Sequence, residues 1–122
     1  MRTLFCHVKE YDLERRTEQF AADCRALVRS VEKDIPNFED SKQLVRASGS
    51  VAANYIEASE PLGSRDFLMK LKISRKEAKE SRLWLSLIKT KQPDLSDQKE
   101  RLIGECIELR KILSAIISKW EP

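Results

Sequence analysis

Two glutamates, Glu57 and Glu77, are the side chains of this chain best suited to acid–base catalysis or metal binding. Both lie in segments with helical periodicity, where facing carboxylates could share a proton or hold a metal ion. A di-iron site of the bundle type needs two Glu-x-x-His motifs, however, and the single histidine is His7, outside the expected helices. No nucleophile elbow or glycine-rich phosphate loop is present. We therefore expect no catalytic residue, metal or cofactor, and a carboxylate pair remains the minor alternative.

Basic residues concentrate between residues 65 and 91. This segment holds nine basic and three acidic residues, a net charge of +6, whereas the rest of the chain sums to −3. Steps of 3, 4, 3 and 7 place five of the basic residues on one side of a helix. This basic stripe, the candidate nucleic-acid-binding site, comprises Lys72, Arg75, Lys79, Arg82 and Lys89. It could follow a phosphate backbone, and a solvated helix face is the alternative explanation of the same spacing.

A second set of polar residues flanks the apolar seam of the preceding expected helix, residues 38–59. Polar groups at such a boundary need hydrogen-bond partners. The expected helix in segment 65–91 could supply them, because the residues of its seam are small, serine and alanine, beside Glu77. We expect a network joining Arg46, Asn54 or Glu57 to the facing polar residues, within one subunit or between two. The residues assigned to this network or to an interface are Arg46, Ser50, Asn54, Glu57, Ser74, Glu77, Ser81 and Trp84.

Gly49 lies within the same expected helix, where glycine costs roughly 1 kcal/mol relative to alanine. The residues around it, 47–53, are mostly small. We expect another backbone to approach closely here, with a ligand groove as the alternative.

Four segments position these side chains, each with apolar residues at alternating steps of four and three. The last segment shows this most clearly, with Leu102, Cys106, Leu109, Leu113, Ile116 and Trp120. Prolines at 36, 61 and 93 separate the segments, and we expect Asn37, Ser64 and Ser96 to cap helix starts. The predicted helices are 12–33, 38–59, 65–91 and 96–120. They predict an all-α fold, an up-down-up-down antiparallel four-helix bundle.

The expected bundle, residues 12–122, is preceded by an N-terminal arm, residues 1–11. The apolar residues of the arm should lie against the bundle or a neighbouring subunit, and they are Leu4, Phe5, Val8 and Tyr11.

The composition fits a small soluble helical domain. Of 122 residues, 35% are charged and 41% hydrophobic, and no apolar stretch is long enough to cross a membrane. Met1 to Tyr11 lacks the apolar core of a secretion signal, so we expect a cytoplasmic protein. Three cysteines without a CxxC pair are expected to be buried and reduced rather than redox-active or zinc-binding: Cys6, Cys24 and Cys106.

The order of several short motifs resembles the small bundle proteins encoded in intervening sequences of bacterial 23S ribosomal RNA genes. The motifs are 11–15 (YDLER), 43–48 (QLVRAS), 51–58 (VAANYIEA), 66–67 (DF), 76–78 (KEA) and 80–85 (ESRLWL). The resemblance covers nearly the whole chain beyond the first ten residues. It implies a four-helix bundle, a homopentamer with a central channel as in characterised relatives, and no established enzymatic activity.

The accessory proteins of diversity-generating retroelements are similar in fold to this family. This second likeness implies nucleic-acid binding through a basic surface, although the net charge of +3 is lower than that of the strongly basic accessories. We therefore expect a non-enzymatic oligomeric bundle that binds RNA or DNA through the basic stripe. The alternative is a structural or protein-interaction scaffold that uses apolar edges near Trp84. Neither hypothesis involves a membrane or a small-molecule substrate.

Overall fold

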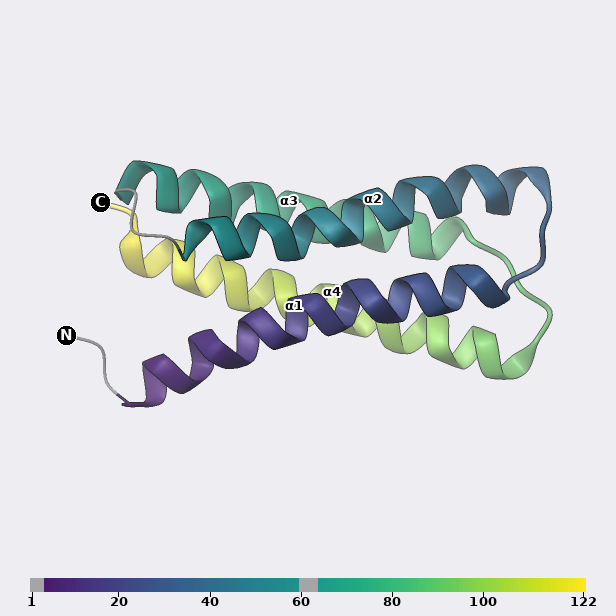
Figure 1. Ribbon diagram of the computed structural model, residues 1–122, viewed down its shortest axis with the longest axis horizontal. Coiled ribbons are helices and arrows are strands. Elements are labelled where there is room, and N and C mark those ends of the chain that lie inside the picture. The colour runs from purple at the N-terminus through teal and green to yellow at the C-terminus, as the bar shows by residue number, and fades with distance from the viewer. Residues whose placement is uncertain (1–3, 60–63) are drawn as a thin grey trace.

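The described residues form four long helices. The computed structural model describes residues 4–59 and 64–122, and the side chains of these residues apart from 4–12 and 64. The helices are α1 (Leu4–Ser30), α2 (Ile35–Ala58), α3 (Ser64–Leu87) and α4 (Pro93–Trp120). They run up, down, up and down, and each packs on its neighbours in the order α1, α2, α3, α4 and back to α1 (Figure 1). The predicted all-α four-helix bundle is confirmed.

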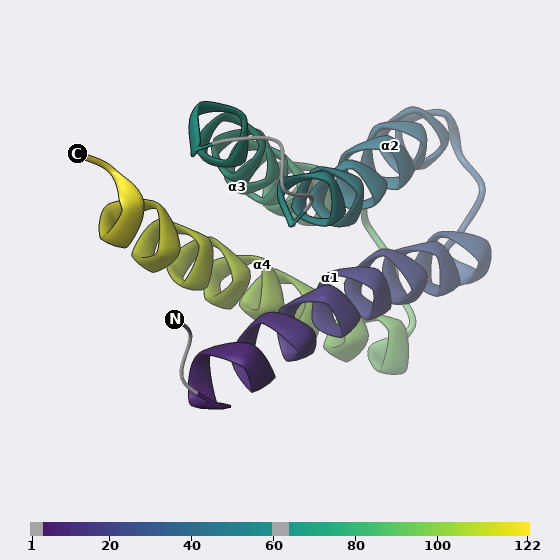
Figure 2. The same ribbon diagram turned by 60° about the vertical axis from the view of Figure 1, so that its left-hand side comes forward.

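The helices form two layers, α2 with α3 and α1 with α4 (Figure 2). α2 and α3 share the most extensive contact, and α1 crosses α4 in the view of Figure 1. The α1–α2 and α3–α4 loops lie together at one end of the bundle. The start of α1 and the C-terminal residue lie toward the opposite end (Figure 1).

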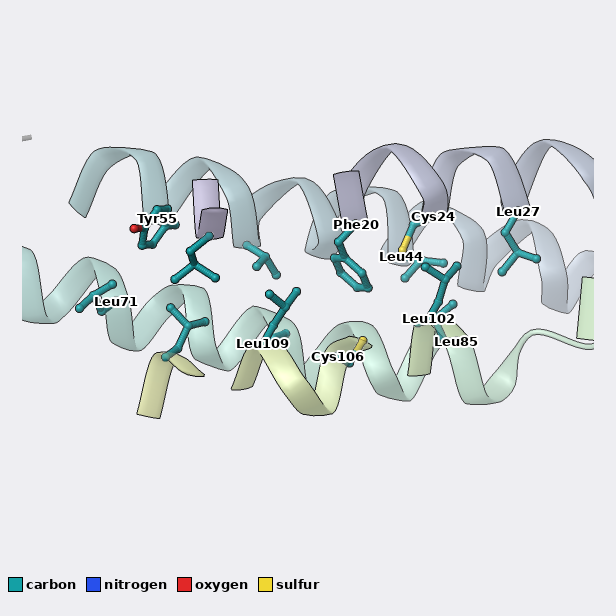
Figure 3. Close-up of a cluster of buried hydrophobic side chains, with 14 of the residues drawn as sticks. Phe20, Cys24, Leu27, Leu44, Tyr55, Leu71, Leu85, Leu102, Cys106 and Leu109 are labelled. Atoms are coloured by element: carbon teal, nitrogen blue, oxygen red, sulfur yellow. The ribbon is translucent and has the colours of Figure 1, made fainter. Parts of the chain in front are cut away.

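The apolar residues of the four ladders meet along the axis between the helices (Figure 3). Fully buried members include Phe20, Leu27, Leu44, Leu71, Leu85 and Leu109. The ladder of α4 ends differently from the prediction, because Ile117 rather than Ile116 is buried and Trp120 is 55% exposed. A straight helix has 3.6 residues per turn, so a strict alternation of fours and threes drifts away from the core over several turns.

Two thiols belong to this core. Cys24 and Cys106 are free and buried, as predicted, whereas Cys6 lies outside the residues whose side chains are described. Burial raises the pKa of the Cys24 thiol to about 12 and also raises the pKa of Cys106. Both therefore remain protonated and unreactive at neutral pH.

The helix starts lie earlier than predicted. α1 begins at Leu4, so residues 4–11 continue the first helix instead of forming a separate arm; the side chains of that segment lie outside those described. α2 and α4 each carry proline in the first turn, Pro36 and Pro93. Proline suits the start of a helix because its fixed φ is helical and the first amide needs no intrahelical partner. Both helices consequently begin upstream of the expected polar caps.

Two of the predicted caps are wrong for this reason. The N-cap of α2 is Asp34, whose carboxylate accepts from the Asn37 backbone N–H at 2.8 Å. α4 begins after Gln92, which makes no side-chain cap, so Ser96 lies inside the helix. The third predicted cap, Ser64, is the first residue of α3, and its side chain is not described.

Asn37 instead joins the two loops at one end of the bundle. The side chain is 2% exposed. Its Nδ2 donates to the carbonyl oxygens of Lys89 and Glu32 at 2.7 and 3.0 Å, and its Oδ1 accepts from the Lys89 N–H at 3.0 Å. One buried amide therefore satisfies backbone groups from the α1–α2 and α3–α4 connections.

Glu32 reinforces the same junction. Its Oε2 accepts from the Lys91 N–H at 2.8 Å. That hydrogen bond is the main cause of a pKa lowered to about 2, with smaller effects from Glu32's own N–H and the Thr90 hydroxyl. The ionised carboxylate is therefore the form that holds the α3–α4 loop.

Replacing Asn37 with alanine should lower the free energy of unfolding by about 2 kcal/mol, because a buried side chain is lost and three partly buried backbone groups lose their partner. Urea unfolding followed by circular dichroism measures the change. Asn54→Ala is the matched control and should cost less, since within the described part of the chain Asn54 bonds only to Ser50, in its own helix. Equal effects of the two variants would contradict the role given to Asn37.

The Glu32 carboxylate should make stability depend on acid pH. Its pKa is about 2 when folded against 4.5 ordinarily, so the folded state binds its proton less readily than the unfolded state. The stabilisation is complete above pH 4.5 and is lost as pH falls toward 2. Glu32→Gln should be less stable than the parent at neutral pH and should show a shallower loss across this range. Urea midpoints at a series of pH values test this, and parallel curves for the two proteins would refute it.

Candidate nucleic-acid interface

Four residues of the basic stripe lie on the side of α3 that faces α4, and the fifth, Lys89, lies in the α3–α4 loop because α3 ends at Leu87 rather than at the predicted residue 91. Lys72 Nζ is 2.7 Å from Glu121 Oε2, just beyond the end of α4. Arg75 Nη1 donates to Ser114 Oγ at 3.3 Å. The Lys72 ammonium lowers the pKa of the Glu121 carboxyl, so the pair is ionised at neutral pH. The N-terminal half of the stripe is thus engaged with the C-terminal part of α4.

The C-terminal half of the stripe is open. Lys79, Arg82 and Lys89 are exposed, and none has an ion-pair partner within residues 13–59 and 65–122. The hydrogen bonds at Lys89 to Asn37 use its backbone groups and leave the ammonium at the surface. These three cations are the part of the stripe most available to an anionic ligand.

α4 adds two cations that the sequence alone did not assign to this surface. Lys99 Nζ donates to the Ile88 carbonyl oxygen at 2.8 Å, across the α3–α4 interface. The antiparallel register set by this bond and by Arg75–Ser114 places the exposed Arg110 level with Lys79. Helical spacing cannot reveal this, because it does not say which face of α4 borders α3. The resulting basic seam comprises Lys79, Arg82, Lys89, Lys99 and Arg110.

The expected polar network is formed in part. Of the predicted α2–α3 side-chain pairs, the described residues contain Arg46–Glu77, at 3.4 Å, and Arg46 also reaches Glu80 at 3.5 Å. Two other contacts cross between α2 and α3: Ser74 donates to the Val51 carbonyl oxygen, and Glu57 pairs with Lys70. Ser81 and Asn54 instead bond within their own helices, to the Glu77 carbonyl oxygen and to Ser50, as polar side chains in helices often do.

The two glutamates that could have acted together have separate basic partners. Glu57 is 2.7 Å from Lys70, whose pKa it raises, and Glu77 is buried against Arg46. Among the residues with described side chains, no group of three or more His, Cys, Asp or Glu could hold a metal ion. The described helices also include none that is long and apolar enough to cross a membrane.

Gly49 accommodates a side chain rather than another backbone. A Cβ at this position would lie 3.1 Å from Nη2 of Arg25, which donates to the Val45 carbonyl oxygen at 3.3 Å. The absent side chain therefore lets an α1 guanidinium lie across α2. The expected close approach of another backbone is wrong at this glycine.

Trp84 lies at the edge of the core. Its ring is half-buried against the core cluster, and Nε1 is buried without a hydrogen-bond partner among the described residues. The second tryptophan, Trp120, packs edge-on against Phe67 with ring centroids 6.1 Å apart. Trp120 was expected in the core and instead lies partly in solvent near the Lys72–Glu121 pair.

A second surface, between α1 and α4, has balanced charge. A groove of about 440 Å³ there is lined by residues of both signs, among them Arg16, Asp23, Arg101 and Glu105. Arg16 donates two hydrogen bonds to Glu105, at 3.0 and 2.7 Å. This neutralisation makes the groove a poorer phosphate site than the basic seam.

Comparison with known proteins agrees with the fold. Residues 9–115 match the family described as 23S rRNA-intervening sequence protein. The chain is similar to a crystal structure of a protein of unknown function from the S23 ribosomal protein family of Bacteroides thetaiotaomicron. The two share 29% identity and a TM-score of 0.73, over 86% of this chain and 97% of the other. No significant match was found among curated proteins. Neither description names an enzymatic activity.

Proposed function

The chain belongs to the 23S rRNA-intervening sequence protein family, and from its surface charge we propose that it binds RNA or DNA through the basic seam. This proposal rests on one observation: Lys79 and Arg82 on α3, and Lys89 just beyond its end, are exposed, with no carboxylate paired to them among the described residues. We place its role in the cytoplasm, without catalysis. The relation to retroelement accessory proteins stays a prediction.

The dimensions of the seam suit a nucleic-acid backbone. α3 continues from Lys79 to its end at Leu87, which is about 12 Å at 1.5 Å per residue, and Lys89 follows two residues later. A nucleic-acid strand carries roughly one phosphate per 3.4 Å of duplex axis, so the helical part of the seam alone spans about three to four phosphates. Lysine and arginine on one helix side would contact phosphates without reading bases, and binding would release counterions.

Self-assembly would strengthen this field. The family resemblance leads us to expect a homo-oligomer, a pentamer in characterised relatives, which would repeat the seam around a symmetry axis. Repeated charge of one sign raises the local concentration of an anionic ligand and its rate of association. A protein scaffold without nucleic-acid binding is the alternative, and the exposed Met69, Leu83 and Leu87 of α3 favour a protein contact on another face.

Replacing Lys79, Arg82 and Lys89 together with glutamine should abolish most binding to a structured RNA and to single-stranded DNA. The slope of log affinity against log salt should also become shallower by about 2 to 3, because roughly that many phosphate contacts are lost. Fluorescence anisotropy over a salt series measures both quantities.

The control for this variant removes three positive charges elsewhere. Lys42, Lys70 and Lys111 lie on other faces, and their joint replacement with glutamine gives the same net charge. This control variant should retain most of the parent's affinity for nucleic acid and most of the parent's salt slope. If the two triple variants lose affinity equally, net charge rather than the seam explains binding. If the parent binds neither nucleic acid, the proposed function is overturned.

Glu121→Gln should strengthen binding by about two- to fivefold, because it frees Lys72 from the 2.7 Å ion pair and extends the seam toward the start of α3. In the same anisotropy assay, the slope of log affinity against log salt should become steeper by about one, as expected for one additional phosphate contact. Glu108→Gln, which releases Lys111 from a pair away from the seam, is the control and should change affinity little. An unchanged affinity for Glu121→Gln would exclude Lys72 from the binding surface.

A further inference from the structure

The outer side of α3 carries a second ladder with the same steps of four and three. This outer ladder, roughly opposite the core residues of α3, comprises Met69, Ile73, Lys76, Glu80, Leu83 and Leu87. Met69, Leu83 and Leu87 are 51%, 43% and 44% exposed, and Ile73 is half-buried. Among the described helices, none covers Met69, Leu83 or Leu87. A 24-residue helix therefore presents one apolar seam to the bundle and another to its surroundings.

The order of apolar and charged residues along the outer ladder is symmetric about its centre, apart from the sign of the two central charges. Its order is two apolar residues, a cation, an anion and two apolar residues, centred at the level of Ala78. In an antiparallel pair of α3 helices related by a two-fold axis at that level, Met69 would face Leu87 of the second copy and Ile73 would face Leu83. Lys76 would face Glu80, twice. A parallel pair would instead set each charge against its own kind, which is unfavourable.

The shape of the surface matches this pairing. The N-terminal half of the ladder borders a shallow groove of about 500 Å³, lined by Arg65, Leu68, Met69, Lys72, Ile73 and Lys76. The C-terminal half presents Leu83 and Leu87. The two-fold axis lays these leucines over the groove of the other copy, and the same fit is repeated at the opposite end.

The central charges are available for the contact. Lys76 is exposed and has no ion-pair partner among the described residues of its own chain. Glu80 has one long contact, 3.5 Å to Arg46, and its side chain is 40% exposed. Reciprocal Lys76–Glu80 pairs would set the direction and register of the contact, and the apolar ends would supply most of its affinity.

We propose that the outer ladder of α3 binds the outer ladder of a second copy of this chain as an antiparallel two-fold pair. This contact is isologous and differs from the head-to-tail contacts that close a ring of subunits. It does not depend on nucleic-acid binding. The two-fold axis also leaves the α4 sides of both copies on one side of the pair, so the two basic stripes would face the same way.

Charge reversal tests the pairing. Lys76→Glu and Glu80→Lys should each weaken self-association at least about tenfold, because each creates two like-charge contacts. An equimolar mixture of the two single variants should restore association, since every reversed charge then meets an opposite one. The double variant K76E/E80K should restore it alone. Sedimentation equilibrium without nucleic acid, over a wide concentration range because one helix face is a small interface, measures each case.

Two controls complete the test. Lys111→Glu, which reverses an exposed charge of α4 away from the ladder, should leave self-association unchanged. Leu83→Gln should weaken it without lowering the helix content measured by circular dichroism. The proposal is overturned if the parent is monomeric, if the single charge variants associate like the parent, or if neither the mixture nor the double variant restores association.

Discussion

Burial of four apolar ladders along one axis is the constraint on which the rest of the structure depends. Each fully buried leucine, such as Leu71 or Leu109, contributes roughly 1.5 to 3 kcal/mol relative to an exposed position. Because the connections between them are short, consecutive helices bury their ladders together by running antiparallel, in one register. That register brings Lys72 to Glu121 and Lys99 to the end of α3, so the electrostatics of the surface follow from packing in the core.

Polar groups near this core are satisfied by short bonds to backbone. Ser74 and Ser81 donate to carbonyl oxygens, and Asn37 bonds to three backbone groups of two loops. Such bonds satisfy buried groups without introducing unpaired charge. Apart from Glu77, which is buried and paired with Arg46, the described charged side chains lie at the boundary or the surface, where they pair with opposite charges or remain available to ligands.

Much of the fold was predictable from sequence because the ladders repeat over many turns. The positions of buried Leu85 and Leu109 follow directly from that repeat. Helix starts were less predictable, since proline at N1 or N2 competes with the polar caps. Only part of the candidate site was predictable, because the spacing of basic residues identifies the stripe of α3 but says nothing of α4. The neutralisation of Lys72 by Glu121 and the addition of Arg110 depend on the register between α3 and α4. A one-dimensional pattern does not contain that register.

Asn37 and Glu32 join the two loops at the same end of the bundle, and this asymmetry has a consequence for local unfolding. An opening that separates the two loops at that end must break several hydrogen bonds together. The opposite end has no comparable link between loops among its described residues. Amide hydrogen exchange should therefore be slower in the helical turns next to these two loops than in the turns at the other end, so that the molecule opens from one end instead of separating evenly along its length.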